Sequence, residues 1–415
     1  MRILVLGGGI VGVTTAWALA KDGHEVELVD RQPLAANETS FSNSGMIAPG
    51  HAYTWNSPRA PGILLKSLWR DDTSLRFKFR ADPRLYLWSL KFLRACTRET
   101  AIRNTRIKLR LCLYSKEQLH ATLAETGVKH DRDTVGALYL FRDPALFERG
   151  IANGRTLIDG GVTLEVCDPK RVREIEPRLV AEGIAGAIYA PGDESGDCHK
   201  FANELARHAA EKFGVRFRWG TRIERLEASA DRVEKVVTDE GELTADAYVL
   251  ALGSDASIQA RKIGVDLPVY PVKGYGATFD VAGRNGAPRV PGVDEQNLVA
   301  WLRIGDRLRF CATAEFAGYD ASHKPADFAH MLKVGQALFP DGADYEKPRM
   351  WAGLRPMTPK GPPILGRGRH GNLWFNAGQG HMGWTMSHGC ARITADLIAG
   401  RAPGVDIAGM TLADA

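Results

Sequence analysis

The 415-residue sequence lacks any apolar run near the roughly 18 residues that cross a bilayer, and it shows no internal repeats or low-complexity tracts. Its six cysteines never have C-x-x-C spacing, so neither a metal centre nor a redox pair is expected, and reduced thiols fit best. Apolar residues make up 44% and charged residues 25%, as in ordinary globular proteins, which excludes disordered, collagen-like and coiled-coil chains.

The N-terminal segment predicts the start of a parallel sheet rather than a signal peptide. Three glycines interrupt its apolar stretch and no small-residue cleavage site follows, so we expect a cytoplasmic protein. Residues 2–6 indicate a buried strand, the segment after the glycines a helix that closes at Gly23, and residues 25–30 a second strand. This order begins a doubly wound α/β fold.

The turn between the first strand and the helix has the spacing G-x-G-x-x-G of dinucleotide-binding proteins. Gly7 permits a tight turn, Gly9 a close approach of the backbone to a pyrophosphate, and Gly12 close packing of the helix on the strand. Ile10 and Val11 open the helix, whose exposed N–H groups favour the pyrophosphate anion. The spacing therefore predicts a nucleotide cofactor.

Asp30 ends the second strand 18 residues after Gly12, where a carboxylate can bond ribose hydroxyls, whereas its neighbour Arg31 does not distinguish NAD from FAD. A second glycine loop near the C-terminus favours FAD, because a flavin is large enough to need both ends of the chain. A helix N-terminus beside the ring also stabilises the negative charge of the reduced flavin. The further cofactor contacts expected are Ala251 and Gly253 in the turn that ends residues 245–253, and Gly378, Gly380, His381, Met382 and Gly383 in the loop.

Three other patterns indicate how the remaining chain is organised. Residues 84–126 have the apolar spacing of one long helix. Residues 271–281 and 297–316 alternate and predict an antiparallel sheet. Residues 372–400 predict a strand, the glycine loop and a helix.

Segments spread from residue 3 to residue 400 carry a resemblance to a known family. Besides the N-terminal unit they include ETSFSNSGMIAPG, DESGDCHKF, YPVKGY, WAGLRPMTPKGPPILG and FNAGQGHMGWTMSHG. Together they resemble the D-amino-acid oxidase/dehydrogenase superfamily of FAD enzymes, and most closely the bacterial D-amino acid dehydrogenases. Residues 100–190 match only loosely.

The resemblance implies two domains built from an interleaved chain. A doubly wound, Rossmann-like FAD-binding domain would comprise residues 1–95, 195–265 and 345–415. An α+β substrate-binding domain would comprise residues 96–194 and 266–344, and its antiparallel sheet would cover the flavin.

The implied reaction is oxidative deamination of D-amino acids to 2-oxo acids and ammonia, with hydride transfer to flavin N5 and a quinone or other non-oxygen electron acceptor. Arg355, in the motif GLRP, would hold the substrate carboxylate by a planar, bidentate match. Tyr275, in KGY, would add a hydroxyl or a wall to the pocket, or would belong to the core. His381 would contact the substrate or the ring, or would be an ordinary loop histidine. His51 stands where the family typically has tyrosine, so its role is open.

A Ser- and Asn-rich loop leads toward the flavin in the family, and its hydroxyls and N–H groups can bond the cofactor. Covalent attachment is not expected, because Trp351 and Ala352 stand where some relatives carry the linking cysteine; the FAD should therefore dissociate. The loop residues expected at the cofactor are Thr39, Ser40, Ser42, Asn43, Ser44, Gly45 and Met46.

Other activities remain open at this point. Within the fold they are a hydroxy-D-proline dehydrogenase and an oxygen-using D-amino acid, glycine or sarcosine oxidase. A flavin-binding electron-transfer subunit would keep the glycine turn but would need no carboxylate-binding arginine. An NAD-dependent dehydrogenase is the third class.

A basic, aromatic stretch raises the question of membrane contact. Residues 66–110 carry 13 Lys and Arg against 4 Asp and Glu, a net charge of +9 within a chain of +5. Such a segment predicts peripheral contact with the inner face of the cell membrane, or a solvated basic face with its aromatics in the core. No nucleic-acid recognition motif accompanies the charge. The aromatics concerned are Trp55, Trp69, Phe77, Phe79, Tyr86 and Trp88.

Overall fold

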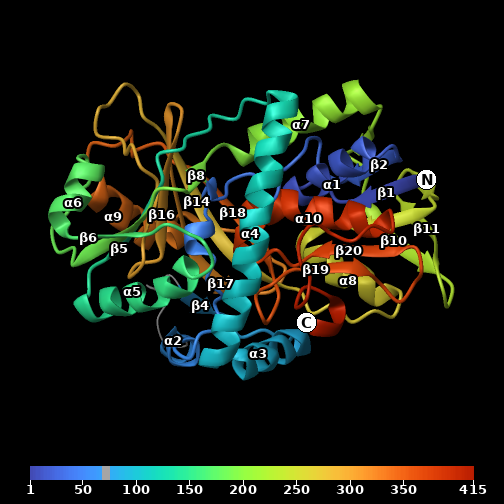
Figure 1. Cartoon of the computed structure of the whole chain (residues 1–415), viewed down its shortest axis with the longest axis horizontal. Helices are drawn as coiled ribbons and strands as arrows, with labels where there is room; N and C mark the ends of the chain where they lie inside the picture. The colour runs from blue at the N-terminus through green and yellow to red at the C-terminus, as the bar shows by residue number, and fades with distance from the viewer. Residues whose placement is uncertain (68–74) are drawn as a thin grey trace.

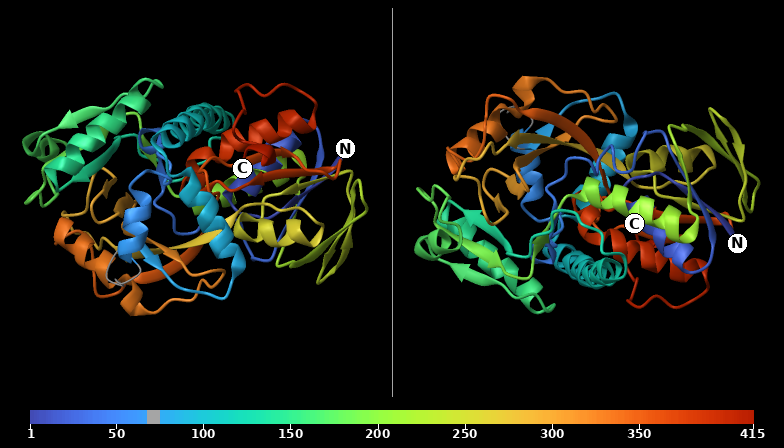
Figure 2. Two further views of the ribbon diagram at one scale, coloured as in Figure 1. Left: turned by 90° about the horizontal axis from the view of Figure 1, so that it is seen from below. Right: turned by 90° about the horizontal axis from the view of Figure 1, so that it is seen from above.

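The computed structural model describes residues 1–67 and 75–415. Two lobes lie side by side, each built around one large sheet, and the long helix α4 (Arg98–Thr126) runs between them (Figure 1). Both chain termini belong to the lobe on the right of Figure 1. Two further views show α4 nearly end-on and still between the lobes (Figure 2).

The first sheet has six strands in the order β19-β20-β13-β1-β2-β9, which are parallel except for β19 at one edge. Its central strands are continuous apolar runs, because a parallel sheet is covered on both faces. The strands are β1 (Arg2–Leu6), β2 (Glu25–Asp30), β9 (Arg216–Trp219), β13 (Ala247–Leu250), β19 (Ile364–Arg367) and β20 (Leu373–Ala377).

Both faces of this sheet are covered, which confirms the predicted doubly wound fold. One face packs on three helices, and the other on a short helix and a small antiparallel sheet. The helices are α1 (Ile10–Lys21), α7 (Cys198–Phe213), α10 (Gly383–Ile398) and, on the second face, α8 (Ala256–Lys262). The small sheet consists of β10 (Ile223–Ala228), β11 (Val233–Thr238) and β12 (Gly241–Leu243).

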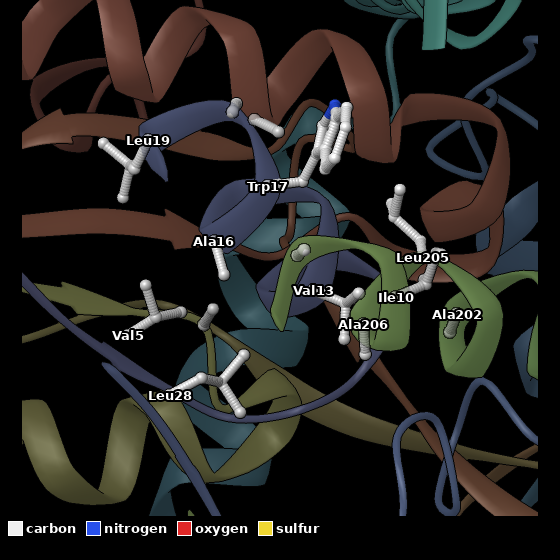
Figure 3. Close-up of a cluster of buried hydrophobic side chains, with 14 of the residues drawn as sticks. Val5, Ile10, Val13, Ala16, Trp17, Leu19, Leu28, Ala202, Leu205 and Ala206 are labelled. Atoms are coloured by element: carbon white, nitrogen blue, oxygen red, sulfur yellow. The ribbon is translucent and has the colours of Figure 1, made fainter. Parts of the chain in front are cut away.

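The core on the helical face forms because α1 is apolar or small on every side and is buried along ten of its twelve residues. Val5 and Leu28 of the strands lie opposite Val13 of α1, and Leu205 of α7 closes the cluster (Figure 3). Each of these fully buried side chains contributes about 1.5–3 kcal/mol. The cluster fixes the start of α1 against the end of β1.

The second sheet is mixed, with the order β18-β14-β17-β16-β15-β5-β7-β6 and with β4 paired to β17. The antiparallel pairing expected for residues 271–281 and 297–316 is confirmed. Its strands are β4 (Leu75–Phe77), β5 (Ala137–Phe141), β6 (Glu165–Cys167), β7 (Gly186–Ala190), β14 (Tyr270–Asp280), β15 (Gly292–Asp294), β16 (Val299–Ile304), β17 (Arg307–Phe316) and β18 (Arg349–Met357). The helices of this lobe are α5 (Pro144–Ile158), α6 (Pro169–Ile175) and α9 (Ala329–Leu338).

The single helix expected over residues 84–126 is two helices. α3 (Pro83–Ala95) ends at Cys96, and α4 begins after Thr97, whose hydroxyl accepts a hydrogen bond from the Thr100 amide at 3.2 Å. No glycine or proline marks the break, so the apolar spacing continues through it. The shorter elements before α3 are β3 (Met46–Ile47), which pairs with β8 (Glu194–Ser195), and α2 (Ala60–Ser67).

Three elements lie across the domain boundaries expected from the sequence. β4 and β18 fall within the ranges expected for the FAD-binding domain, yet both pair within the second sheet. α4 falls within the range expected for the substrate-binding domain, yet it packs along α10 of the first lobe. The expected ranges came from the family resemblance, whereas strand pairing and helix packing join segments that are distant in the sequence.

Three expectations from the sequence concern membrane-spanning helices, metal sites and cysteine thiols. No helix within the described ranges has the length and apolar composition needed to cross a bilayer. Among the described residues, no group of three or more His, Cys, Asp or Glu side chains could hold a metal ion. All six cysteines belong to the described residues and are free thiols.

Candidate active site

A cavity of about 910 Å³ extends from the end of β1 to the second sheet. Ligand pockets in proteins are typically about 300–1,000 Å³, so this one is large enough for an extended cofactor. One end is formed where β1, β2 and β13 finish, at the carboxyl edge where open α/β sheets bind ligands. The other end is formed by β14, β17 and β18 of the second sheet.

The glycine turn is shaped as its spacing predicts. Gly7 has a φ of +108°, and a Cβ at Gly12 would overlap the Gly7 carbonyl oxygen, so α1 packs directly on the turn. Gly9 is the N-cap of α1, and a Cβ there would meet only the Ser40 hydroxyl at 3.5 Å. The turn therefore places Ile10 and Val11, the first residues of α1, at the wall of the cavity.

Asp30 lines the cavity at the end of β2. Its carboxylate accepts the Gly8 amide at 2.5 Å and the Gln32 amide at 2.7 Å, and burial raises the pKa of the carboxyl. The neighbouring Arg31 is bound by Glu38, with a shortest distance of 2.6 Å, and by Asp255. The carboxylate of Asp30 thus lies beside the glycine turn, whereas Arg31 is held by acids.

The loop of residues 39–46 contributes six residues to the wall of the cavity. The Ser40 hydroxyl accepts the Ile10 amide at 3.2 Å, and the Thr39 hydroxyl donates to the Leu354 carbonyl at 2.8 Å. The Ser42 hydroxyl is buried and has no hydrogen-bond partner among the described residues. A Cβ at Gly276 would lie 2.7 Å from that hydroxyl, so the sheet leaves room for the loop. A buried hydroxyl without a partner at a cavity fits a polar ligand there.

Arg355 projects from β18 over β14. Its guanidinium occupies the space that a side chain at Gly274 would fill, and its Nη1 donates to the Thr313 carbonyl at 2.7 Å. Thr313 has a φ of +70°, because the pairing of β14 with β17 is irregular there. Burial lowers the pKa of Arg355, but a guanidinium remains charged in proteins. No carboxylate among the described residues forms an ion pair with Arg355, so a half-buried cation faces the cavity.

Tyr275 lies on the opposite face of β14 from Gly274, because neighbouring strand residues point to opposite sides. Its ring packs edge-on against Phe328 in the core of the second lobe, with centroids 5.2 Å apart. Its hydroxyl donates to Glu315 at 3.0 Å. The hydroxyl is therefore engaged on the side of the sheet away from Arg355, although Tyr275 is one of the residues that line the cavity.

The C-terminal glycine loop joins β20 to α10. Gly378 and Gly380 have φ values of +78° and +62°, and the 3-10 turn Gly380–Met382 leads into α10. His381 lines the cavity and stacks on Trp55 with ring centroids 4.9 Å apart. Burial holds the pKa of His381 well below its usual range, so the imidazole is neutral at physiological pH.

Most of the sequence-predicted residues line this one cavity, and three do not. Gly12, Gly45 and Gly378 instead shape the turns, since added side chains would meet Gly7, Leu302 and Thr358 respectively. Sequence reasoning missed Trp55 as a partner of His381, and it missed Glu295 entirely. The predicted residues that line the cavity are Gly7, Gly9, Ile10, Val11, Asp30, Arg31, Thr39, Ser40, Ser42, Asn43, Ser44, Met46, Ala251, Gly253, Tyr275, Arg355, Gly380, His381, Met382 and Gly383.

A doubly wound sheet, a glycine turn and a long cavity closed by a second sheet define a nucleotide-dependent oxidoreductase. The model of the FAD dependent oxidoreductase family matches residues 2–397, and the chain belongs to this family. FAD is therefore its cofactor, and the orphaned Ser42 hydroxyl and the bare glycine turn fit that molecule.

More specific relatives share nearly the whole length. The chain is 43% identical over 412 residues to D-amino acid dehydrogenase 2 of Mesorhizobium japonicum, covering 99% of both chains. It is 45% identical over 413 residues to the D-amino acid dehydrogenase of Paramagnetospirillum magneticum, covering 99% of this chain and 98% of the relative.

Solved structures share the fold at lower identity. Glycine oxidase from Geobacillus kaustophilus aligns with a TM-score of 0.77 at 22% identity, covering 99% of this chain and 98% of the other. Iminodiacetate oxidase from Chelativorans sp. aligns with a TM-score of 0.73 at 21% identity, covering 99% and 98%. These likenesses concern the fold alone.

Proposed function

We propose that this enzyme oxidises D-amino acids to 2-oxo acids and ammonia and passes the electrons to a quinone. The observation that carries the proposal is the half-buried guanidinium of Arg355, which faces the cavity without a carboxylate partner among the described residues. An amino acid carboxylate would supply the missing anion by a bidentate pair. The full-length similarity to D-amino acid dehydrogenases supports the D configuration.

FAD, when bound, supplies the acceptor for the hydride that leaves the substrate Cα. We propose that Gly7, Gly9, Ile10 and Val11 hold its pyrophosphate, that Asp30 bonds its ribose, and that Gly12 keeps the turn closed. The remaining proposed contacts are Arg31, Thr39, Ser40, Ser42, Asn43, Ser44, Gly45, Met46, Ala251, Gly253, Gly378, Gly380, His381, Met382 and Gly383.

We propose that the protein binds the substrate, orients it and excludes water from it. Arg355 holds the carboxylate, and the stacked rings of His381 and Trp55 form a wall of the pocket. Because His381 is neutral, it adds no positive charge beside the substrate amino group, which must lose a proton before the hydride leaves. Tyr275 anchors β14, the strand that pairs with the strand of Arg355.

Anaerobic mixing with single substrates tests the proposed reaction. D-Alanine and D-proline should bleach the flavin absorbance, whereas their L isomers should not. In air, turnover should release little peroxide, because the electrons leave through a non-oxygen acceptor. Bleaching by L isomers alone would falsify the proposal, and bleaching by glycine or sarcosine with stoichiometric peroxide would assign an oxidase instead.

The proposed acceptor and location follow from an apolar and basic surface on α2, α3 and the segment before α3, which we call the α2–α3 surface. Seven large apolar side chains are exposed there, and basic residues lie among them. Ile63, which belongs to this surface, also lines the cavity. The apolar residues are Ile63, Leu65, Phe79, Tyr86, Leu87, Leu90 and Leu93, and the exposed basic ones include Lys78, Arg80, Lys91 and Arg94.

The aromatic residues of the basic stretch divide between the surface and the interior. Phe79 is 70% exposed and Tyr86 45%, whereas Trp88 is buried and donates to the Met357 carbonyl. Trp55 lines the cavity, and Trp69 lies outside the described residues. We propose that the α2–α3 surface docks on the anionic inner leaflet of the cell membrane, from which a quinone reaches the cavity.

Vesicle binding tests the α2–α3 surface. The double substitution Leu87→Asp with Leu90→Asp removes two of its apolar side chains and adds two negative charges, which the anionic lipid repels. Affinity for phosphatidylglycerol vesicles should therefore fall at least about tenfold. Activity with a long-chain quinone should fall in parallel, while activity with a water-soluble dye should persist. Ile158→Asp, at an exposed residue that ends α5, is the matched control. Equal vesicle binding by all three proteins would refute the docking surface.

A further inference from the structure

Glu295 and His51 form an ion pair on the wall of the cavity, outside the contacts assigned above. Glu295 follows β15, and His51 ends the 3-10 turn Pro49–His51. His51 Nε2 lies 2.8 Å from Glu295 Oε1, and the two side chains are 29% and 21% exposed. Both line the cavity that contains Arg355.

The position of Glu295 is fixed by the turn between β15 and β16. Its amide donates to the Leu140 carbonyl at 2.9 Å, which attaches the turn to β5. Asp294, fully buried, accepts a hydrogen bond from Arg142 at 2.8 Å. Leu298 has a φ of +52°, a conformation that a branched residue adopts only where its surroundings impose it. The carboxylate of Glu295 is therefore presented by a constrained turn.

The ring of His51 is also fixed in position. It stacks on Tyr139 with centroids 4.7 Å apart and an interplanar angle of 15°. The Tyr139 hydroxyl donates to Asp193 at 2.6 Å, and Asp193 also accepts the Gly50 amide at 2.8 Å, beside His51 in the turn. Stacking and the anchored backbone leave the imidazole little freedom except toward Glu295.

The acidic groups around His51 favour its protonated form. Burial disfavours the charged imidazole, but Glu295 and Asp193 outweigh burial and the positive charge of Lys108, and they raise the pKa of His51. Glu295 lines the cavity, and its Oε2 makes no hydrogen bond to any described residue, so this oxygen is available to a ligand. A carboxylate accepts several hydrogen bonds but donates none.

The pKa of His381 is affected both by His51 of the ion pair and by Arg355, the proposed carboxylate anchor. Burial is the main cause of its lowered pKa, and the charges of both His51 and Arg355 lower the pKa further. His381 is therefore within electrostatic reach of the two groups. Arg355 and Glu295 both line this cavity, so its wall carries a guanidinium and a carboxylate, which complement a molecule with an anionic and a cationic end.

We propose that Glu295, held by His51, binds the cationic end of the substrate side chain, so that basic D-amino acids are preferred to neutral ones of the same shape. This inference rests on the proposed oxidation of D-amino acids in this cavity. It names Glu295 as a specificity-determining residue and His51 as its positioning partner. Acidic side chains would be rejected by the same carboxylate.

D-Arginine and D-citrulline test the proposal, because they match in shape and differ in charge. The wild-type kcat/KM should be at least about tenfold higher for D-arginine. Glu295→Gln keeps the shape and can still accept the His51 hydrogen bond, and it should lower this ratio at least about tenfold. Glu242→Gln, which removes the same charge from exposed β12, should keep the wild-type ratio. Flavin content and Tm report whether each variant is folded.

The outcomes separate this inference from the proposed function. Flavin reduction by D-alanine together with a D-arginine to D-citrulline ratio near one would overturn the role of Glu295 and leave the proposed function standing. An unchanged ratio in Glu295→Gln would do the same. If no D-amino acid reduces the flavin, the proposed function fails and this inference fails with it.

Discussion

Replacing Arg355 by alanine is expected to lower kcat/KM for D-alanine by about 10³-fold. Truncating one partner of a buried, hydrogen-bonded charge pair costs about 2–5 kcal/mol, and each 1.4 kcal/mol is a factor of ten. The guanidinium of Arg355 has only the Thr313 carbonyl as a partner among the described residues, so the substrate carboxylate should supply most of its pairing. Steady-state kinetics on flavin-loaded enzyme measure the loss.

Two comparisons show whether the loss of kcat/KM comes from the missing contact with the substrate carboxylate. Arg349→Ala removes an exposed arginine of the same strand, paired with Asp280, and should change kcat/KM less than threefold, as a surface pair contributes only about 0–1 kcal/mol. D-Alaninamide lacks the carboxylate, so Arg355→Ala should cost far less with it than with D-alanine. A variant that keeps its flavin and stays within tenfold of wild type on D-alanine would remove Arg355 as the anchor.

The glycine turn illustrates what local spacing can predict. Each of its requirements lies within the 30 residues from β1 to the end of β2, so Gly7, Gly12 and Asp30 could be assigned physical roles from their order alone. The structure gives Gly7 a positive φ and Gly12 no room for a side chain, as that reasoning requires. Short-range geometry was therefore predictable.

The second sheet shows where spacing alone was insufficient. Arg355 reaches its position because β18 pairs with β14 and Gly274 leaves space, and Tyr275 points away from it for the same reason of strand register. Glu295 reaches the cavity through the pairing of β15 with β5, a contact between segments about 150 residues apart. Nothing in the neighbouring sequence distinguishes that carboxylate from an exposed one.

Gly12→Ala should abolish FAD binding and destabilise the protein. The new Cβ would overlap the Gly7 carbonyl oxygen, which belongs to the backbone and cannot rotate away, so β1 and α1 must separate. Overpacking of a core costs about 1–3 kcal/mol, and the stabilisation that bound FAD provides would be lost as well. The measurements are flavin absorbance of the purified protein and Tm with and without added FAD.

Gly9→Ala separates the effect on cofactor binding from the effect on core packing. Its Cβ would meet only the Ser40 hydroxyl at 3.5 Å, and the φ of −65° suits alanine, so the apoprotein should keep its Tm within a few degrees. The methyl group would nevertheless stand where the backbone must approach the pyrophosphate, so FAD affinity should fall strongly. Gly192→Ala, with no atom within 4 Å of its added Cβ, should match wild type in both measurements. If Gly9→Ala bound FAD normally, the pyrophosphate would have to lie elsewhere than at the start of α1.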